Sequence, residues 1–274
     1  MADVHQQPDA VTFLDRAEAW LQGRPDLTHN LILSIAHQLS GNGHFEPPFY
    51  LATVESNDRL CGCAVRAAPD GIFMTALPVD AVAQIVDQTR RLYSALPEVI
   101  GPESVATAFA ELWSGQRWTL HERSCCYRLR SVNASLQPSP GSMRQGTTED
   151  LTWLRDWARD YSAETGTRVD LQRFYSLMVE RGLLYVWDDD GPRCVVTTSK
   201  LTPSGAEISS LYIPKHFRHN GYATAAVAAA SQRVLDSGRQ FCFISADEQA
   251  VGTQRIYRRV GYEPIDSMVV IHLD

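Results

Sequence analysis

The stretch of sequence that most constrains the fold lies at residues 209–223, which read SSLYIPKHFRHNGYA. An apolar, aromatic run ends at Pro214, a short basic segment follows, and an alanine-rich run begins at Tyr222. Proline has no backbone N–H for a sheet, so it predicts the end of a strand. The alanine-rich run predicts a helix over 222–237 that ends at Gly238. The sequence therefore predicts a strand, a tight loop and a helix in direct succession.

This succession favours an anion-binding site. The first N–H groups of a helix have no partner within the helix and carry the positive end of its dipole, so a diphosphate can accept several bonds there. Gly221 has no side chain to keep a ligand from the backbone, and Ala223 is small enough for close packing. A strand that ends at Pro214 can also separate from its neighbour and expose the backbone of residues 211–213 to an extended amide-bearing ligand.

Composition limits the partners. Lys and Arg number 25 and Asp and Glu 32, giving a formal net charge of −7. This balance argues against a large surface for nucleic acid or anionic membrane, so any anion site is expected to be local. No stretch approaches the roughly 18 apolar residues of a membrane span, and the sequence starts with neither a basic nor an apolar targeting segment. We expect a cytoplasmic protein without a nucleic-acid or membrane partner.

The chain is predicted to contain two α/β (α+β) domains. Residues 131–142, SVNASLQPSPGS, resemble an exposed linker between residues 1–130 and 143–274. In the second part we expect helices at about 148–161, 170–181, 222–237 and 252–260, and strands at 143–145, 183–187, 194–201, 207–213, 241–245 and 268–273. In the first part we expect helices at 9–23, 27–39, 79–96 and 103–114, and strands at 49–55, 60–67, 71–77 and 118–129.

The similar order of elements suggests two copies of one architecture, although the two halves show no residue-level similarity. Two unrelated α/β units are the alternative.

The residues of the C-terminal half resemble the GNAT acetyltransferase superfamily. That family binds acetyl-CoA with Arg or Gln, two residues, Gly, one residue, and Gly or Ala between a strand and a helix, which Arg218, Gly221 and Ala223 match. A second stretch, Ile256-Tyr257-Arg258-Arg259-Val260-Gly261-Tyr262, is similar to the family's Ile-Tyr-x-x-x-Gly-Tyr helix end. The two motifs occur in the expected order within residues 143–274, and the N-terminal half looks like a degenerate copy.

The resemblance implies two tandem GNAT-like domains, each with a mixed, mostly antiparallel sheet flanked by helices. It also implies acetyl-CoA as cosubstrate and no metal. The pantetheine arm would pair with the strand, and the diphosphate would bind the loop. The expected cofactor-binding residues are Leu211, Tyr212, Ile213, Arg218, His219, Asn220, Gly221, Tyr222, Ala223 and Thr224.

Three basic side chains near this loop leave two interpretations open. Lys215, His216 and His219 lie within sequence reach of a further phosphate, but they can equally be solvated surface groups. The spacing of the two histidines permits a metal pair, yet no carboxylate or thiolate accompanies them, so we expect no metal.

Catalytic roles also follow from the resemblance. Tyr257 matches the tyrosine that many family members use to protonate the thiolate leaving group, although its spacing also fits a core-facing ring. Glu207, at the start of the central strand, is the expected base that deprotonates the amine, with Asp247 and Glu248 as rivals. A charged residue that marks a strand end is the structural alternative for each carboxylate. A backbone N–H near Leu211 or Tyr212 would stabilise the oxyanion.

The sequence departs from the family pattern at one position. Relatives often carry an Asn that contacts the cofactor arm after the strand at 241–245, and alignment on Ile256-Tyr257 places Ala250 there. The first domain lacks the glycine of the loop, because its equivalent stretch reads Thr75-Ala76-Leu77-Pro78-Val79-Asp80-Ala81. We therefore expect one cofactor per chain, bound by the second domain.

These features predict an N-acetyltransferase that transfers acetyl from acetyl-CoA to a primary amine in a ternary complex. The acceptor would be a small-molecule or peptide amine, and the acidic composition favours a cationic one. Oligomeric state is not determined by these features. A non-catalytic acyl-CoA sensor is the alternative. A nucleotide-dependent enzyme of another fold is a third option, but the Gly-x-Gly-x-x-Gly pattern of dinucleotide binding is missing.

Overall fold

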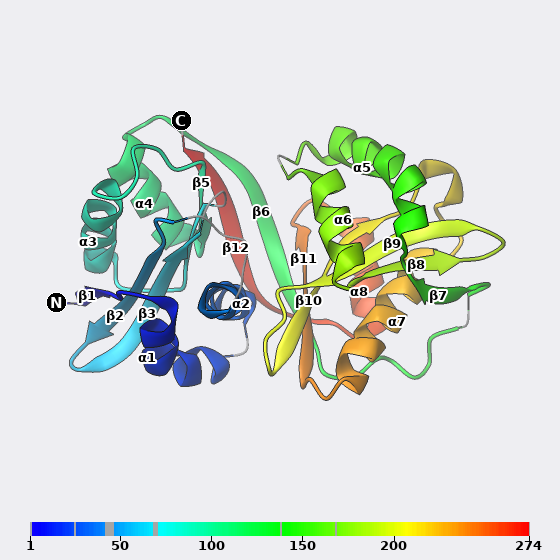
Figure 1. Cartoon of the computed structure of the whole chain (residues 1–274), viewed down its shortest axis with the longest axis horizontal. Helices are drawn as coiled ribbons and strands as arrows, with labels where there is room; N and C mark the ends of the chain where they lie inside the picture. The colour runs from blue at the N-terminus through cyan, green and yellow to red at the C-terminus, as the bar shows by residue number, and fades with distance from the viewer. Residues whose placement is uncertain are drawn as a thin grey trace. The chain divides into compact units, whose positions relative to one another are not determined.

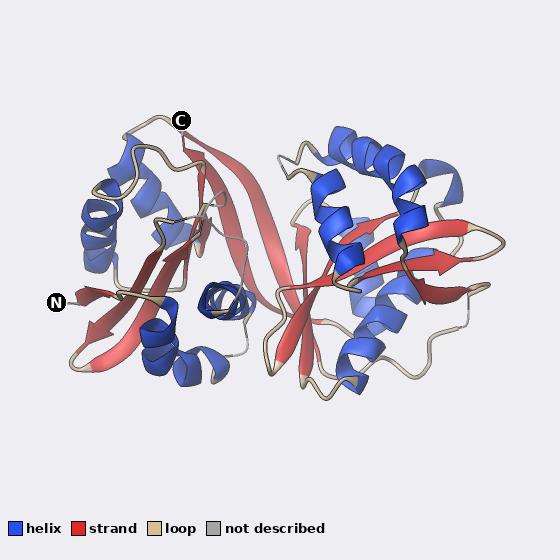
Figure 2. Cartoon of the chain, viewed as in Figure 1, coloured by secondary structure: helices blue, strands red, loops and turns tan. Residues whose placement is uncertain are grey.

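The computed structural model describes residues 2–24, 26–41, 47–67, 71–137, 139–167 and 169–273 and shows a mixed α/β chain (Figure 1, Figure 2). The chain divides into two compact units. Unit 1 comprises Met1–Cys126, Ser245–Gln249 and Pro264–Asp274, and unit 2 comprises Tyr127–Ile244 and Ala250–Glu263.

In unit 1 the strands follow the order β1-β2-β3-β4-β5-β12. Neighbouring strands are antiparallel except β4 and β5, which run parallel. The elements that begin in this unit are β1 (Asp3–Gln6), α1 (Ala10–Gln22), α2 (Leu27–Ser40), β2 (Tyr50–Ser56), β3 (Arg59–Arg66), β4 (Ile72–Met74), α3 (Val79–Arg90), β5 (Glu98–Gly101), α4 (Glu103–Ser114) and β6 (Trp118–Leu129).

In unit 2 the strands follow the order β11-β10-β9-β8-β7, again antiparallel except for one parallel pair, β10 and β11. The remaining elements are β7 (Ser142–Gln145), η1 (Thr148–Asp150), α5 (Leu151–Thr165), α6 (Leu171–Glu180), β8 (Leu184–Asp188), β9 (Pro192–Ser199), β10 (Gly205–Tyr212), η2 (Lys215–Phe217), α7 (Tyr222–Asp236), β11 (Phe241–Asp247), α8 (Val251–Val260) and β12 (Glu263–Leu273).

The two halves repeat one succession of elements. Each has a short strand, two helices, three strands, a helix, a strand, a helix and a final long strand. In each, the parallel pair joins the third of the three strands to the strand after the next helix. The predicted fold class, two copies of a mixed and mostly antiparallel sheet with flanking helices, is confirmed.

Helices cover both faces of each sheet. In unit 2, α5 and α6 share a core with β8, β9 and β10, built around Leu154, Tyr175, Val186 and Val195. Helix α7 contacts the same strands, and Figure 1 shows it with α8 on the face opposite α5 and α6. In unit 1, α3 and α4 pack on β2, β4 and β5, and α1 and α2 contact one another and the strands β2 and β3.

The two compact units do not follow the domain boundary predicted at residues 131–142. Most of β12 belongs to unit 1, because Val269 to His272 pair with β5 and Val269, Ile271 and Leu273 enter the unit 1 core. The segment at 131–142 belongs to unit 2.

Strand β1 was not predicted, since Asp3–Gln6 carries a single apolar residue. It pairs with β2, and glutamines of α3 bond its backbone.

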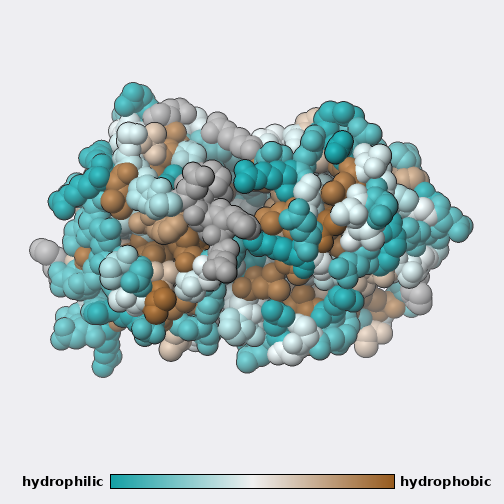
Figure 3. All heavy atoms as spheres, in the orientation of Figure 1, coloured by the Kyte–Doolittle hydropathy of each residue, from teal (hydrophilic) through white to brown (hydrophobic). Residues whose placement is uncertain are grey.

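In the part of the chain that the structure describes, no helix has both the length and the apolar character to cross a membrane. Hydrophilic residues dominate the face drawn in Figure 3, with smaller hydrophobic patches between them.

Candidate active site

Strand β10 changes its pairing halfway along. It is parallel to β11 only from Gly205 to Glu207, which lie opposite Phe241 to Phe243. Beyond that point a bulge interrupts its ladder with β9, because the register shifts between Ser209 and Tyr212. Ser210 lies in this bulge with a φ of 49°, a value that a non-glycine residue rarely adopts. The predicted separation of β10 from its neighbour is confirmed, and it begins well before Pro214.

The loop after β10 presents a row of unpaired amides. His219 and Gly221 both have positive φ values, 67° and 84°. Among the described residues, none accepts a hydrogen bond from the backbone N–H groups of residues 219–224; the first N–H to donate is that of Ala225, to the Gly221 carbonyl at 3.1 Å. Successive amides in such a turn form a concave anion-binding surface at the positive end of α7. The geometry predicted for this loop is therefore present.

A cavity of about 600 Å³ lies beside this loop within unit 2. Its walls come from the segment before β7, the exposed side of α7, β8 and the end of α8. The lining residues are Val132, Asn133, Leu136, Gln137, Ser139, Pro140, Gly141, Trp187, Asn220, Gly221, Thr224, Ala225, Ala228, Ala229, Gln232 and Arg259. The space next to the free amides is thus open and is bounded by both polar and apolar groups.

The Arg218 side chain contacts protein groups. Its Nε donates to the carbonyl of Ile213 at 3.0 Å, and an Nη donates to the Glu164 carboxylate of α5 at 2.6 Å. The Tyr212 hydroxyl donates to the other oxygen of Glu164 at 3.2 Å. The hydrogen bond from Arg218 lowers the pKa of Glu164, while burial, and then the negative charge of Glu164, raises the pKa of Tyr212 to about 12.

The other predicted loop residues divide into anchors and exposed groups. Tyr222 donates from its hydroxyl to Asp189 at 2.6 Å, and Asn220 donates from its amide to the Phe217 and Arg218 carbonyls. Thr224 lines the cavity, and Ala223 is half-buried on α7. Of the strand residues, Leu211 and Ile213 are half-buried and follow the bulge.

The basic groups near the loop lie at the surface. Lys215, His216 and His219 are exposed, and the His216 ring lies 3.9 Å from the ring of Phe217. No group of three or more His, Cys, Asp or Glu side chains that could hold a metal occurs within the described ranges.

Tyr257 lies on α8 with a buried ring. Its ring meets the ring of Tyr127 edge-on, at a centroid distance of 5.9 Å, and lies 6.0 Å from that of Tyr262. Its hydroxyl has no hydrogen-bond partner within the described chain. Burial raises the pKa of Tyr257, and the nearby Tyr161 and Glu207 add to that effect. The ring is therefore core-facing, as one prediction had it, and its unpaired hydroxyl keeps its proton at neutral pH.

Glu207 is buried near the point where β10 and β11 separate. It is 7% exposed. The Ser199 hydroxyl donates to its carboxylate at 3.1 Å, and the Lys200 ammonium lies 3.6 Å away.

The two rival carboxylates, Asp247 and Glu248, lie in unit 1. There Asp247 accepts from the Gln249 N–H, and Glu248 pairs with Arg123 at 3.5 Å. Ala250 immediately precedes α8 and supplies no side-chain cap.

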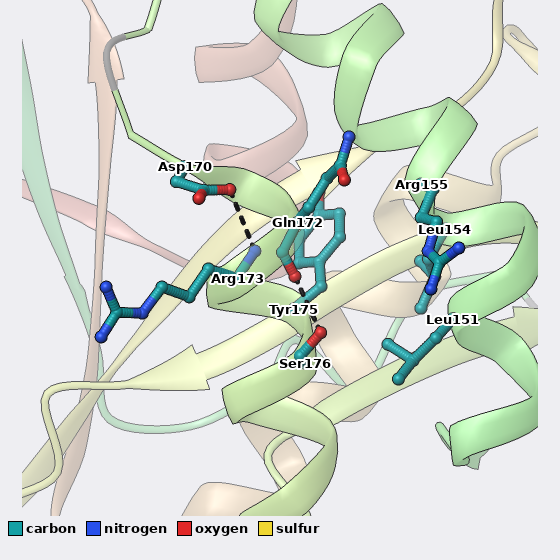
Figure 4. A pocket seen from close by; sticks show the side chains of 8 residues that line it. All are labelled: Leu151, Leu154, Arg155, Asp170, Gln172, Arg173, Tyr175 and Ser176. Atoms are coloured by element: carbon teal, nitrogen blue, oxygen red, sulfur yellow. Dashed lines mark hydrogen bonds between the residues drawn. The ribbon is translucent and has the colours of Figure 1, made fainter.

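Sequence reasoning missed Glu164 and the cavity-lining residues of 132–141. Glu164 stands 54 positions from Arg218 on the polar side of a helix, so no local pattern marks it. A second cavity, of about 360 Å³, lies between α5 and α6 and contains none of the predicted site residues. Figure 4 shows Arg155 and Leu151 on its α5 side and Gln172 and Tyr175 on its α6 side.

Solved structures are similar to this chain over its full length. An acetyltransferase of the GNAT family from Colwellia psychrerythraea is 14% identical with a TM-score of 0.59, and 98% of each chain is covered. A tandem GNAT protein from the clavulanic acid biosynthesis pathway is 14% identical with a TM-score of 0.58, covering 99% of this chain and 98% of that one. A Drosophila protein reaches a TM-score of 0.72 at 12% identity, covering 99% and 98%.

No protein-family model matches the sequence, and no curated protein matches it. The likeness is therefore one of fold, and it extends across both halves of the chain. The protein has the fold of a tandem GNAT acetyltransferase.

Proposed function

We propose that this protein is an N-acetyltransferase that transfers an acetyl group from acetyl-CoA to a primary amine. One observation carries the proposal: the unpaired amides of residues 219–224 open next to a cavity, directly after a strand that has separated from its neighbour. A diphosphate and an extended amide-bearing arm need these two features side by side. The fold shared with GNAT acetyltransferases supports the same assignment.

The residues present fit acetyl-CoA as cosubstrate. The amides of His219 to Thr224 would donate to the diphosphate, and Gly221 leaves room for it to approach the backbone. The bulged end of β10 at Leu211 to Ile213 would pair with the amides of the pantetheine arm. Acetyl-CoA supplies an acetyl group activated as a thioester. Lys215 is exposed beside the loop and would add positive charge near the phosphates, and His219 is exposed beside it.

Two side chains would carry out the proton transfers of the reaction, one from the amine and one to the thiolate. An amine attacks only when it is neutral, so Glu207 would accept the proton that the ammonium form releases. Attack of the neutral amine on the thioester carbon forms the C–N bond, and the C–S bond then breaks. Tyr257 keeps its proton because burial raises its pKa, and its hydroxyl would donate that proton to the departing thiolate. The attached nitrogen would in turn give its extra proton to the Tyr257 oxygen, which leaves a neutral amide. A backbone N–H at the bulge would stabilise the negative charge on the thioester oxygen.

The acceptor would be a small-molecule or peptide amine. The net charge of −7 favours a cationic acceptor over an anionic one. The same net charge argues against a nucleic-acid or anionic membrane partner, so we propose neither.

A screen of primary amines, read by thiol release from acetyl-CoA, tests the assignment. The expected result is release that requires both the chain and an amine, and that falls strongly in Tyr257→Phe. Unchanged turnover in that variant would remove Tyr257 as the acid. Binding of acetyl-CoA without turnover on any amine would favour the acyl-CoA sensor, and no binding at all would refute the proposal.

A further inference from the structure

The arginine of the loop motif connects three elements. Glu164, near the C-terminal end of α5, binds the Tyr212 hydroxyl with one carboxylate oxygen and the Arg218 guanidinium with the other. The same guanidinium bonds the carbonyl of Ile213. We call this set, formed by Glu164, Tyr212, Arg218 and the Ile213 carbonyl, the Glu164 clamp. It joins α5, the end of β10 and Arg218, the residue just before the amide row.

The clamp fixes both ends of the segment that carries η2. That segment runs from Tyr212, the last residue of β10, to Arg218, the residue before the first free amide. Its internal bonds are short-range, from Phe217 N to the Pro214 carbonyl and from Arg218 N to the Lys215 carbonyl. Such bonds shape the turn but do not place it on the domain. The clamp ties the segment to a helix distant in sequence, in addition to the Arg193 guanidinium that lies over the Phe217 ring at 4.4 Å.

The chemistry of the clamp makes it a firm anchor. Hydrogen bonds that involve an ionised donor or acceptor are roughly twice as strong as neutral ones. The contact between Arg218 and Glu164 has an ionised group on both sides, at 2.6 Å. The guanidinium is only partly exposed, with 37% of its side chain accessible, so water competes less for it than for a free surface arginine.

We propose that Glu164 is a positioning residue for the cofactor loop: it holds Tyr212 and Arg218 so that the amides of residues 219–224 face the diphosphate. This rests on the proposed function. The Arg218 side chain then acts through Glu164 and Ile213, and the backbone amides make the contact with the phosphates. Loss of the clamp weakens binding of diphosphate-bearing ligands and leaves the binding of the pantetheine arm by β10 intact.

A matched control separates the contact from the charge. Asp160 lies one turn earlier on α5, and its charge also acts on Tyr212. Its side chain makes no hydrogen bond or ion pair to the rest of the described chain. Asp160→Asn therefore removes a similar negative charge near the loop while the clamp stays in place.

The experiment measures the binding of CoA and of pantetheine, which has no diphosphate, to the full chain and to Glu164→Ala, Glu164→Gln and Asp160→Asn. We expect Glu164→Ala to weaken CoA about tenfold and to leave pantetheine unchanged. Glu164→Gln keeps one oxygen acceptor, so its affinity for CoA should lie between that of Glu164→Ala and that of the parent chain. In turnover, the KM for acetyl-CoA should rise while kcat stays constant.

The outcomes distinguish this inference from the proposed function. If the parent chain binds CoA and Glu164→Ala binds it equally well, the positioning role is wrong and the transferase assignment stands. If Asp160→Asn weakened CoA binding as much as Glu164→Ala does, the loss of a negative charge, and not the loss of the clamp, would explain the effect. Equal loss of pantetheine and CoA, with a lowered melting temperature, would show a general structural role. A parent chain that binds no CoA would overturn both proposals.

Discussion

The same position in the two units, the start of the helix that follows β4 or β10, carries a carboxylate in unit 1 and none in unit 2. Helix α3 begins after Pro78, and Asp80 in its first turn accepts a hydrogen bond from the Ala2 N–H at 3.0 Å. Helix α7 begins after Gly221, and no described residue covers its first amides. The first copy thus has a carboxylate in the first turn of this helix, bonded to the residue before β1, whereas the second copy has no acidic residue there.

The strands before these helices also differ between the units, in how far they stay paired with the neighbouring parallel strand. In unit 1, β4 and β5 stay close, since a Cβ on Gly101 would lie only 2.5 Å from the Met74 carbonyl oxygen. In unit 2, β10 bulges at Ser210 and stays paired with β11 only to Glu207. The helix start without a carboxylate therefore occurs together with a separated strand, and the helix start that carries Asp80 occurs with a closely packed pair. Under the proposed function, both features of unit 2 would serve one ligand.

The most direct test of the comparison is to close the open site. Gly221→Ala forces a side chain into a φ of 84° and places its Cβ 3.3 Å from the Ser139 hydroxyl. We expect CoA affinity to fall at least about thirtyfold, because loop strain of about 1–2 kcal/mol and lost amide contacts add. Isothermal titration calorimetry measures the affinity of each variant for CoA.

Gly238→Ala is the matched control for that change. It has a φ of 89° at the other end of α7 and no neighbouring atom within 4 Å. It should lower the melting temperature to a similar degree and leave CoA affinity unchanged. Equal losses of CoA affinity in the two variants would argue against the loop at Gly221 as the CoA-binding site.

Removal of the Tyr257 hydroxyl is expected to change rate without changing affinity. Tyr257→Phe should reduce kcat by about a hundredfold, the usual scale for loss of a general acid, with CoA binding unaltered. Tyr127→Phe, which removes a hydroxyl bonded to Gln254, serves as control. A kcat loss as large in Tyr127→Phe would indicate a packing effect in place of proton donation.

The helix start of unit 1, which follows Pro78 and carries Asp80 in its first turn, predicts a stoichiometry of one. Calorimetry at saturating CoA should give a single equivalent per chain, and Asp80→Ala should leave that value unchanged, because Gln84 still bonds the backbone of Ala2 and Val4. The variant should lose about 1 kcal/mol of unfolding free energy with its hydrogen bond to Ala2. Two equivalents in the parent chain would contradict the contrast between the units.

The smallest expected effect is a pH dependence in the stability of unit 2, around Asp150. Asp150 binds Arg144, the Thr147 N–H and the Trp153 indole. Burial raises its pKa, but Arg144 and the Thr147 N–H outweigh this and lower the pKa below the usual 3.8. The ionised form therefore stabilises the fold above about pH 4, and this contribution is lost as pH falls through the lowered pKa.

Denaturation of Asp150→Asn and the parent chain from pH 7 to pH 3 measures this effect. The gap in stability should be constant from pH 7 to 5 and should shrink below pH 4. A gap that widens on acidification would contradict the assigned sign.

Local patterns predicted much of the fold and half of the site. The run from Leu211 to Ala223 predicted the strand, the loop and the helix, because Pro, Gly and Ala act on their own backbone. The repeated order of elements predicted the two copies. Those signals are local in the chain, and each element they describe is present.

Contacts between distant segments were not predicted. Nothing near Glu164 indicates that it binds Arg218, and the bulge at Ser210 arises from pairing with β9. Strand β1 exists through its bonds to Gln84 and Gln88. In each case the deciding partner lies far away in the sequence, where periodicity and capping rules give no information.

The placement of β12 affects how the protein is made. Its residues 269–272 complete the sheet of unit 1 beside β5, although they follow the whole of unit 2 in the sequence. A ribosome delivers the chain from the N-terminus, and domains made first usually fold first. Until the final strand has been synthesised, the first half lacks the strand that pairs with β5, so we expect the N-terminal half alone to fold incompletely.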